Sequence, residues 1–391
     1  MLTKFFNYSI LLFLFSSAYA DMGMSGMISN QITRTVNDSI AKNLFDNLII
    51  PQLKVKNSSG AILDMQLSPK QRFLSLTLED GSARVWDLDV GVQRPMITMK
   101  NGGIRAISAN SQNNVLFVAN NRSIDTFDIL TATAIASFPI TMSDVNIINK
   151  TPSADLSFII SHGNELTAWD AKSQKTQWSN SITDGSVQQM TIAADPQLLA
   201  VLVRTPSLFS SADHLEIRQL STGAVSKVLE HKGLKVISFQ FSDAEILESI
   251  YENGDIIRWN SVTGEQLSSS NRGHNIIASS KTTQGIAAYA IDQDTILIVN
   301  QNGQLLSRIS KEGIGSQSIQ LLANGKKLIT AGSDGKATLW DSKTGSELLQ
   351  IISTKQGWSI VDKLGRFDSS EKAMPNISWE ADNNEIALDS F

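Results

Sequence analysis

The chain has 391 residues, of which 41% are hydrophobic, with a formal net charge of −5 and no cysteine. Without cysteine the sequence excludes disulfides, thiolate metal sites and thiol nucleophiles. Its acidic balance argues against nucleic acid as a partner, because phosphate binding needs clustered Lys and Arg. The composition favours a protein held together by a large apolar core.

The first twenty residues predict a cleavable Sec-type signal peptide. Lys4 gives a weakly basic start, residues 10–15 are apolar, and Ala18-Tyr19-Ala20 has the small-x-small pattern of a cleavage site. The apolar run is well short of the roughly 20 residues that span a bilayer. We therefore expect no membrane span, a mature chain that begins near Asp21, and a periplasmic or secreted protein.

Residues 21–49 are predicted to form a methionine-containing tail and then an amphipathic helix. Apolar residues recur at every fourth position among polar ones and stop before Pro51, as on a helix with one apolar face; they are Ile28, Ile32, Val36, Ile40, Leu44 and Leu48. We expect this helix to pack on the rest of the protein or to dock on a partner.

The tail itself contains Met22, Met24 and Met27. Thioether sulfurs are soft ligands that suit Cu(I) in an exported protein, so copper handling is one alternative for this segment. A short terminal tail of small residues also needs no ligand to explain it.

One block recurs along residues 50–353: an apolar strand, a tight polar turn, a second apolar strand that ends in an aromatic residue plus Asp or Asn, then another turn and strand. Segment 73–88 shows it around Asp80-Gly81, and a late copy repeats it around Asp334-Gly335. Steps of 41, 42, 49, 41, 40 and 41 residues separate the aligned positions, which are Trp86, Phe127, Trp169, Arg218, Trp259, Val299 and Trp340. A period of ~40–45 residues with four short strands predicts the blades of a β-propeller.

The repeats resemble the WD-repeat family. The resemblance rests on the dipeptide Gly273-His274 and on the pairs that end the second strand, which are Trp86-Asp87, Phe127-Asp128, Trp169-Asp170, Trp259-Asn260 and Trp340-Asp341. It implies an all-β fold, a seven-bladed propeller of an exported bacterial kind, and protein–protein interaction as the usual role.

In this family a His before a blade, an Asp in its central turn and the Trp can form a hydrogen-bonded set. Here His231 precedes the Trp259 blade, whose turn residue is Asn253, and the blade after His274 has Val299 in place of Trp. We therefore expect no blade to have the complete set.

Two segments, 51–56 and 346–352, could supply the outer strand of the last blade. Either can complete that blade, as N-terminal outer strands do in the family. The spare strand keeps an eight-bladed ring as an alternative.

Residues 354–391 are predicted to form a C-terminal hairpin and tail, with the turn at Leu364-Gly365. The hairpin resembles a segment that follows propellers in bacterial proteins with a caspase-like protease domain. Only 23 residues follow Asp368 and the chain has no nucleophilic cysteine, so we expect that domain to be missing. We expect the hairpin to plug or brace the propeller.

No nucleophile, metal or phosphate motif is present, so we expect neither an enzyme nor a cofactor. One blade, 166–178, also resembles a repeat of quinone-dependent dehydrogenases and of their non-catalytic relatives. A propeller that binds a cofactor or small molecule therefore stays open as an alternative.

The loops between repeats are the candidates for partner binding. The turn at 204–214 is enlarged, and an apolar pair at its tip would suit an anchor for a partner. Loops 100–103, 230–233, 271–274 and 311–313 carry mixed charges, which suit a protein surface better than a single anionic ligand. We predict a non-catalytic scaffold or adaptor of the bacterial cell envelope, with an envelope or secreted protein bound at Leu208, Phe209, His231, Lys232, Arg272, His274 and Lys311.

Overall fold

The computed structural model describes residues 52–387 except 57, 69–70, 100–102, 111–113, 152–156, 184, 194–197, 207–211, 283, 312–313, 315–317, 323, 363–365 and 382–383. The predicted signal peptide, methionine tail and amphipathic helix lie outside the described residues. Within them, the one helical element is a 3₁₀ turn at Met374–Asn376. Over the same residues, no helix has the length and apolarity to cross a bilayer.

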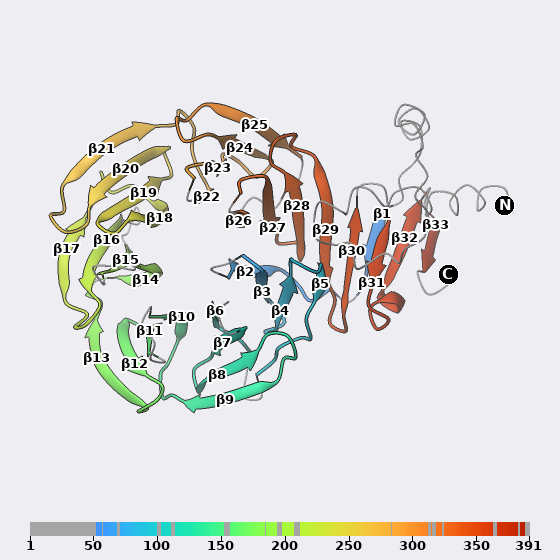
Figure 1. Ribbon diagram of the computed structural model, residues 1–391, viewed down its shortest axis with the longest axis horizontal. Coiled ribbons are helices and arrows are strands. Elements are labelled where there is room, and N and C mark those ends of the chain that lie inside the picture. Colours follow the sequence, from blue (N-terminus) through green and yellow to red (C-terminus); the bar gives the residue numbers. More distant parts are fainter. Residues whose placement is uncertain are drawn as a thin grey trace.

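Seven antiparallel sheets stand around a central axis; six have four consecutive strands that run outward in sequence order, and the seventh has two more at its outer edge (Figure 1). Blades one to three comprise β2 (Ile62–Leu67), β3 (Phe73–Leu78), β4 (Ala83–Asp87) and β5 (Val92–Gln93); β6 (Ala106–Asn110), β7 (Val115–Ala119), β8 (Ser123–Asp128) and β9 (Ala134–Pro139); and β10 (Val145–Lys150), β11 (Ser157–His162), β12 (Glu165–Asp170) and β13 (Lys175–Ser181).

Blades four to six comprise β14 (Ser186–Ile192), β15 (Leu198–Thr205), β16 (Ala212–Gln219) and β17 (Val225–Leu229); β18 (Val236–Asp243), β19 (Ile246–Tyr251), β20 (Asp255–Asn260) and β21 (Gln266–Asn271); and β22 (Ala278–Lys281), β23 (Ala287–Ala290), β24 (Thr295–Val299) and β25 (Leu305–Ser310). Blade seven comprises β26 (Ser318–Leu321), β27 (Lys327–Ala331), β28 (Lys336–Asp341) and β29 (Glu347–Ser353). The all-β, seven-bladed propeller predicted from the repeats is confirmed.

The acid or amide after each aromatic residue has a local task, which explains the repeat. In blade seven, Asp341 Oδ1 accepts hydrogen bonds from the backbone N–H groups of Lys343 and Thr344, at 3.0 and 2.7 Å, and so closes the turn into β29. Asp128 and Asn260 cap the corresponding turns of blades two and five in the same way. Such side-chain caps replace backbone partners that a tight turn leaves unpaired.

The core lies between blades, not inside one sheet. Each pair of neighbouring blades encloses a separate apolar cluster, and Trp86, Trp169, Trp259 and Trp340 each lie in one of them. Among the described residues, the clusters at six of the seven interfaces contain nine to eleven buried side chains, whereas the cluster between blades five and six contains six. The ring is therefore least apolar between blades five and six.

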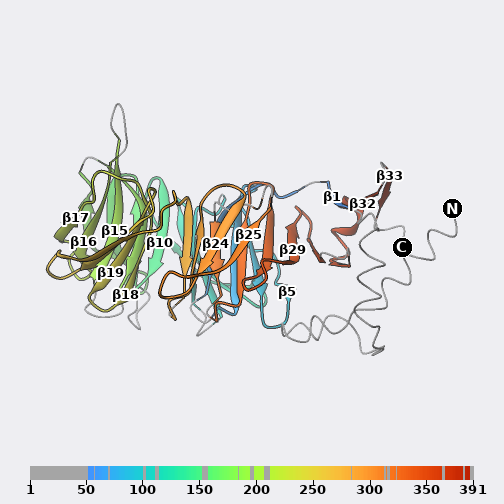
Figure 2. The same ribbon diagram turned by 90° about the horizontal axis from the view of Figure 1, so that it is seen from above.

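The ring closes without help from the N-terminal strand. β29 completes blade seven, while β1 (Gln52–Val55) pairs outside the ring with β32 (Ile377–Ala381), which in turn pairs with β33 (Asn384–Ala387). Figure 2 shows this small sheet beside the wall of the ring. The eight-bladed alternative is wrong, because the spare strand, β1, pairs with β32 of the C-terminal segment.

The predicted C-terminal hairpin is β30 (Trp358–Asp362) with β31 (Phe367–Ser369), and it extends blade seven to six strands. Its expected turn at 364–365 lies outside the described residues. The Trp358 ring meets the Trp86 ring of blade one edge-to-face, with centroids 5.2 Å apart. The hairpin thus braces the seam where the last blade meets the first.

A buried arginine joins the same seam to the segment that leads into blade one. Arg84 is 1% exposed, and its guanidinium donates to the Thr354 carbonyl at 3.0 Å and to the Ser59 hydroxyl at 3.1 Å. A backbone bridge between Ser58 and Thr354 lies alongside. The segment before blade one and the segment after β29 are therefore joined where the ring closes.

Candidate functional site

A hydrogen-bonded network in blade five gathers two of the predicted partner-binding loops. Asp255, at the start of β20, accepts hydrogen bonds from the side-chain amides of Asn253 and Asn271, at 2.8 and 2.7 Å. His231 Nε2 lies 2.8 Å from the same carboxylate. Because an ionised carboxylate can only accept, His231 donates in this pair. Together these hydrogen bonds, those from Asn271 and Asn253 above all, hold the pKa of Asp255 well below its usual range.

Blade five has a His–acid pair, but its acid starts β20 instead of lying in the central turn and Trp259 bonds to Ser249, so the His–Asp–Trp set is incomplete, as expected. The acid lies two residues beyond the expected turn position, at Asp255, and Asn253 donates to it. Trp259 Nε1 donates to the Ser249 hydroxyl at 2.8 Å, and the Tyr251 ring lies 4.8 Å from the His231 ring. Burial raises the pKa of Tyr251 to about 12. Blade five therefore has a His–acid pair near its rim and a buried Trp–Ser pair in its core.

Exposed polar and charged side chains lie around the buried His231–Asp255 pair. Lys232 is 71% exposed and its ammonium lies 3.7 Å from Asp255. The Glu252 backbone N–H donates to the Lys235 carbonyl at 3.0 Å, and the His274 carbonyl lies against Gly254 in the central turn. We call the exposed set the blade-five rim; it comprises Glu230, Lys232, Lys235, Glu252 and His274.

The remaining predicted residues are placed elsewhere. Lys311 lies in the loop between blades six and seven, where it pairs with Glu347 and lies 5.7 Å from the centre of the Trp340 ring. Leu208 and Phe209, like Met22, Met24 and Met27, lie outside the described residues. The enlarged turn around 204–214 is shorter than expected, because β15 and β16 continue the ladder to Thr205 and Ala212. Every partner-binding and metal assignment made from the sequence stays a prediction.

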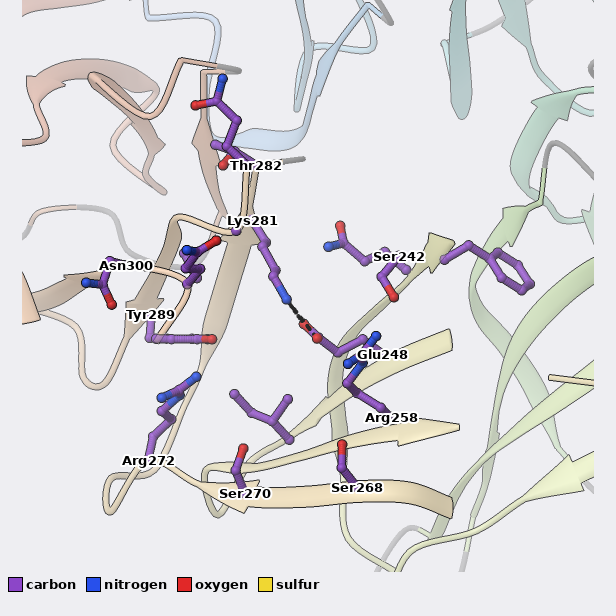
Figure 3. Close-up of a pocket in the computed structure, with 17 residues that line it drawn as sticks. Ser242, Glu248, Arg258, Ser268, Ser270, Arg272, Lys281, Thr282, Tyr289 and Asn300 are labelled. Atoms are coloured by element: carbon purple, nitrogen blue, oxygen red, sulfur yellow. Dashed lines mark hydrogen bonds and ion pairs between the residues drawn. The ribbon is translucent and has the colours of Figure 1, made fainter. Parts of the chain in front are cut away.

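Arg272, the last of the predicted residues, lies in a cleft between blades five and six, which we call the 5–6 cleft (Figure 3). The cleft has a volume of about 490 Å³. One wall is a polar row that crosses blade five from strand to strand in register, made of Gln240, Glu248, Arg258 and Ser268. The other wall includes Lys281, Tyr289 and Asn300 of blade six.

An ion pair spans the cleft. Lys281 Nζ donates to both oxygens of Glu248, at 2.6 and 2.7 Å, and the Glu248 side chain is 7% exposed. Arg272 lies over the Tyr289 ring, 5.5 Å from its centroid. Burial raises the pKa of Tyr289, and the nearby Arg272 guanidinium opposes that shift without cancelling it. Figure 3 shows Arg258 beside Glu248, with Tyr289 and Arg272 grouped opposite.

Sequence reasoning missed Glu248, Lys281 and Arg258. Two of them could have been noticed in the sequence. Glu248 and Arg258 interrupt the apolar runs of β19 and β20 at positions where other blades have apolar or small residues. Only the fold shows that these interruptions face blade six together.

No group of three or more His, Cys, Asp or Glu that could hold a metal ion occurs within the described part of the chain.

Known proteins resemble this chain in fold. No protein-family model and no curated protein sequence matches it. The solved structure of the C-terminal WD40 domain of Sif2 matches with a TM-score of 0.55, covering 71% of this chain and 80% of that one at 13% sequence identity. The chain therefore has the seven-bladed fold of WD40 propellers.

Proposed function

We propose that this chain is a non-catalytic interaction scaffold of the bacterial cell envelope. It is exported by its first twenty residues and binds an envelope or secreted protein through loops on the rim of the propeller. The observation that carries the proposal is the blade-five rim, where five exposed charged or polar side chains lie around the buried His231–Asp255 pair.

Preorganisation supports this proposal. Asp255 fixes the loop that carries His231 and the loop that carries Asn271, so the exposed side chains between them are presented on a constrained backbone. A rigid surface loses less conformational entropy when it binds a partner than a mobile one does. The rim also mixes Lys and Glu, and mixed charge selects a complementary protein surface.

Charge reversal tests the binding surface. The tagged protein is captured from cross-linked native envelopes as wild type and as the double variant Lys232→Glu/Glu252→Lys, which keeps the net charge. We expect a specific partner to be captured by the wild type and to be lost from the variant. The matched control, Lys172→Glu, changes an exposed lysine in a turn of blade three and should retain the partner. Equal capture by all three proteins would argue against the rim.

Export is tested separately by mass spectrometry of the protein from cell fractions. The proposal expects a mature chain that begins at Asp21 in the periplasmic or secreted fraction. A chain that retains residues 1–20 in the cytoplasmic fraction would contradict export without affecting the binding test.

A further inference from the structure

The 5–6 cleft departs from the construction of the other blade interfaces. Propeller blades ordinarily bury flat apolar faces against each other, and here a polar row of blade five faces polar residues of blade six. The apolar cluster at this interface is correspondingly reduced to Ile250, Ile256, Ile276, Ala287, Tyr289 and Val299. Apolar burial is the main stabilising term in a fold, so its replacement by a polar cleft at one interface calls for a functional reason.

The charges of the cleft do not balance. Three cations line it, Arg258, Arg272 and Lys281, together with a single carboxylate, Glu248. Because Glu248 is held by Lys281 through both oxygens, it neutralises that cation. Neither arginine forms an ion pair with any residue that the structure describes. The cleft therefore has an excess of two guanidinium groups.

One of these guanidinium groups is also short of a hydrogen-bond partner. Arg272 Nε is buried and has no acceptor in the part of the chain that the structure describes. The group is held in place over Tyr289, at 5.5 Å, and next to Gly303, whose missing side chain leaves room for it. A fixed guanidinium with an unused donor favours a carboxylate or a phosphate, since both accept its forked hydrogen bonds.

We propose that the 5–6 cleft binds a small organic anion, with Arg258 and Arg272 contacting its carboxylate or phosphate group. The hydroxyl and amide groups of Ser268, Ser270 and Asn300 contact a hydroxylated body. The volume of about 490 Å³ lies in the range of small-molecule sites, about 300–1,000 Å³. This site is separate from the blade-five rim, and its ligand is a small molecule, not the partner protein.

Isothermal titration of the purified mature chain tests the proposal with three probes of similar size: glucuronate, glucose 6-phosphate and glucose. We expect at least one of the two anions to bind, more weakly at higher salt, and glucose to give no heat of binding. The stronger anion identifies the group as carboxylate or phosphate. Absence of binding by both anions at millimolar concentrations, or equal binding of glucose, would overturn the proposal.

Variants locate the site. Arg258→Gln and Arg272→Gln should each weaken binding of the anion by about tenfold or more, because each removes a charge-assisted hydrogen bond. Arg122→Gln, in an exposed turn of blade two, is the matched control and should bind as the wild type does. Arg258 is exposed, so its variant keeps the test valid if Arg272→Gln reduces folding. Unchanged affinity of Arg258→Gln and of a folded Arg272→Gln would overturn the assignment of the anion to this cleft.

Discussion

At the scale of single residues, Asp255 shows how a buried acid stabilises a loop. Its carboxylate receives hydrogen bonds from Asn271, Asn253 and His231, with Lys232 nearby, and its pKa is lowered accordingly. A carboxyl with a lower pKa in the folded than in the unfolded chain adds stability above the unfolded value of about 3.9. That stability is lost as the pH falls through the folded pKa.

The substitution Asp255→Asn removes the charge that these hydrogen bonds stabilise. The wild type should be more stable than the variant by about 1–3 kcal/mol at pH 5, since hydrogen bonds to a charged group are lost. This difference in the free energy of unfolding between the wild type and the variant should become smaller as the pH falls from about 4 to 3. Urea unfolding at several pH values measures the difference. A difference that stays constant from pH 5 to pH 3 would disprove the stabilising role of the Asp255 charge.

Two side-chain pairs could not be predicted from the sequence. The family pattern places the acid that pairs with His231 in the central turn, at position 253, whereas the acid that His231 contacts is Asp255. The Glu248–Lys281 pair joins residues 33 positions apart in different blades. A period in the sequence predicts strands, but it does not predict which polar side chains meet across an interface.

At the scale of elements, the blades themselves were the most predictable feature. Each tight turn is closed by side chains within a few residues, as Asp341 does for Thr344, so the signal is local and recurs with the blade. The partner of β1 was not predictable, because strand pairing outside the ring depends on where the chain ends meet. Its pairing with β32 corrected the expectation of a possible eighth blade.

The hairpin β30–β31 should stabilise the ring through Trp358. Trp358 is half-buried against Trp86 at the seam, so Trp358→Ala should lower the free energy of unfolding by roughly 2–4 kcal/mol. Leu267→Ala, on the outer strand β21 where the side chain is 51% exposed, is the control and should change it by less than about 0.5 kcal/mol. Chemical denaturation measures the free energy of unfolding of both variants. Similar small decreases in the two would mean that the hairpin does not brace the ring.

At the scale of the whole molecule, the closure and the candidate binding surfaces are separated. The seam lies where blade seven meets blade one, beside the sheet of β1, β32 and β33; blade four lies across the ring from it, and blade five is next to blade four (Figure 1). The described strands β1, β32 and β33 therefore lie beside the seam and away from the blade-five rim. A ring closed at one side and displaying loops at the other suits a scaffold.

Site-specific photo-cross-linking tests the scaffold proposal most directly. A photoreactive amino acid replaces Lys232, Glu252 or His274 on the blade-five rim, or Lys172 in blade three, and the cells are irradiated. We expect one discrete adduct of the same partner protein from each rim position and none from Lys172. Adducts from Lys172 alone, or from no position, would contradict partner binding at the rim.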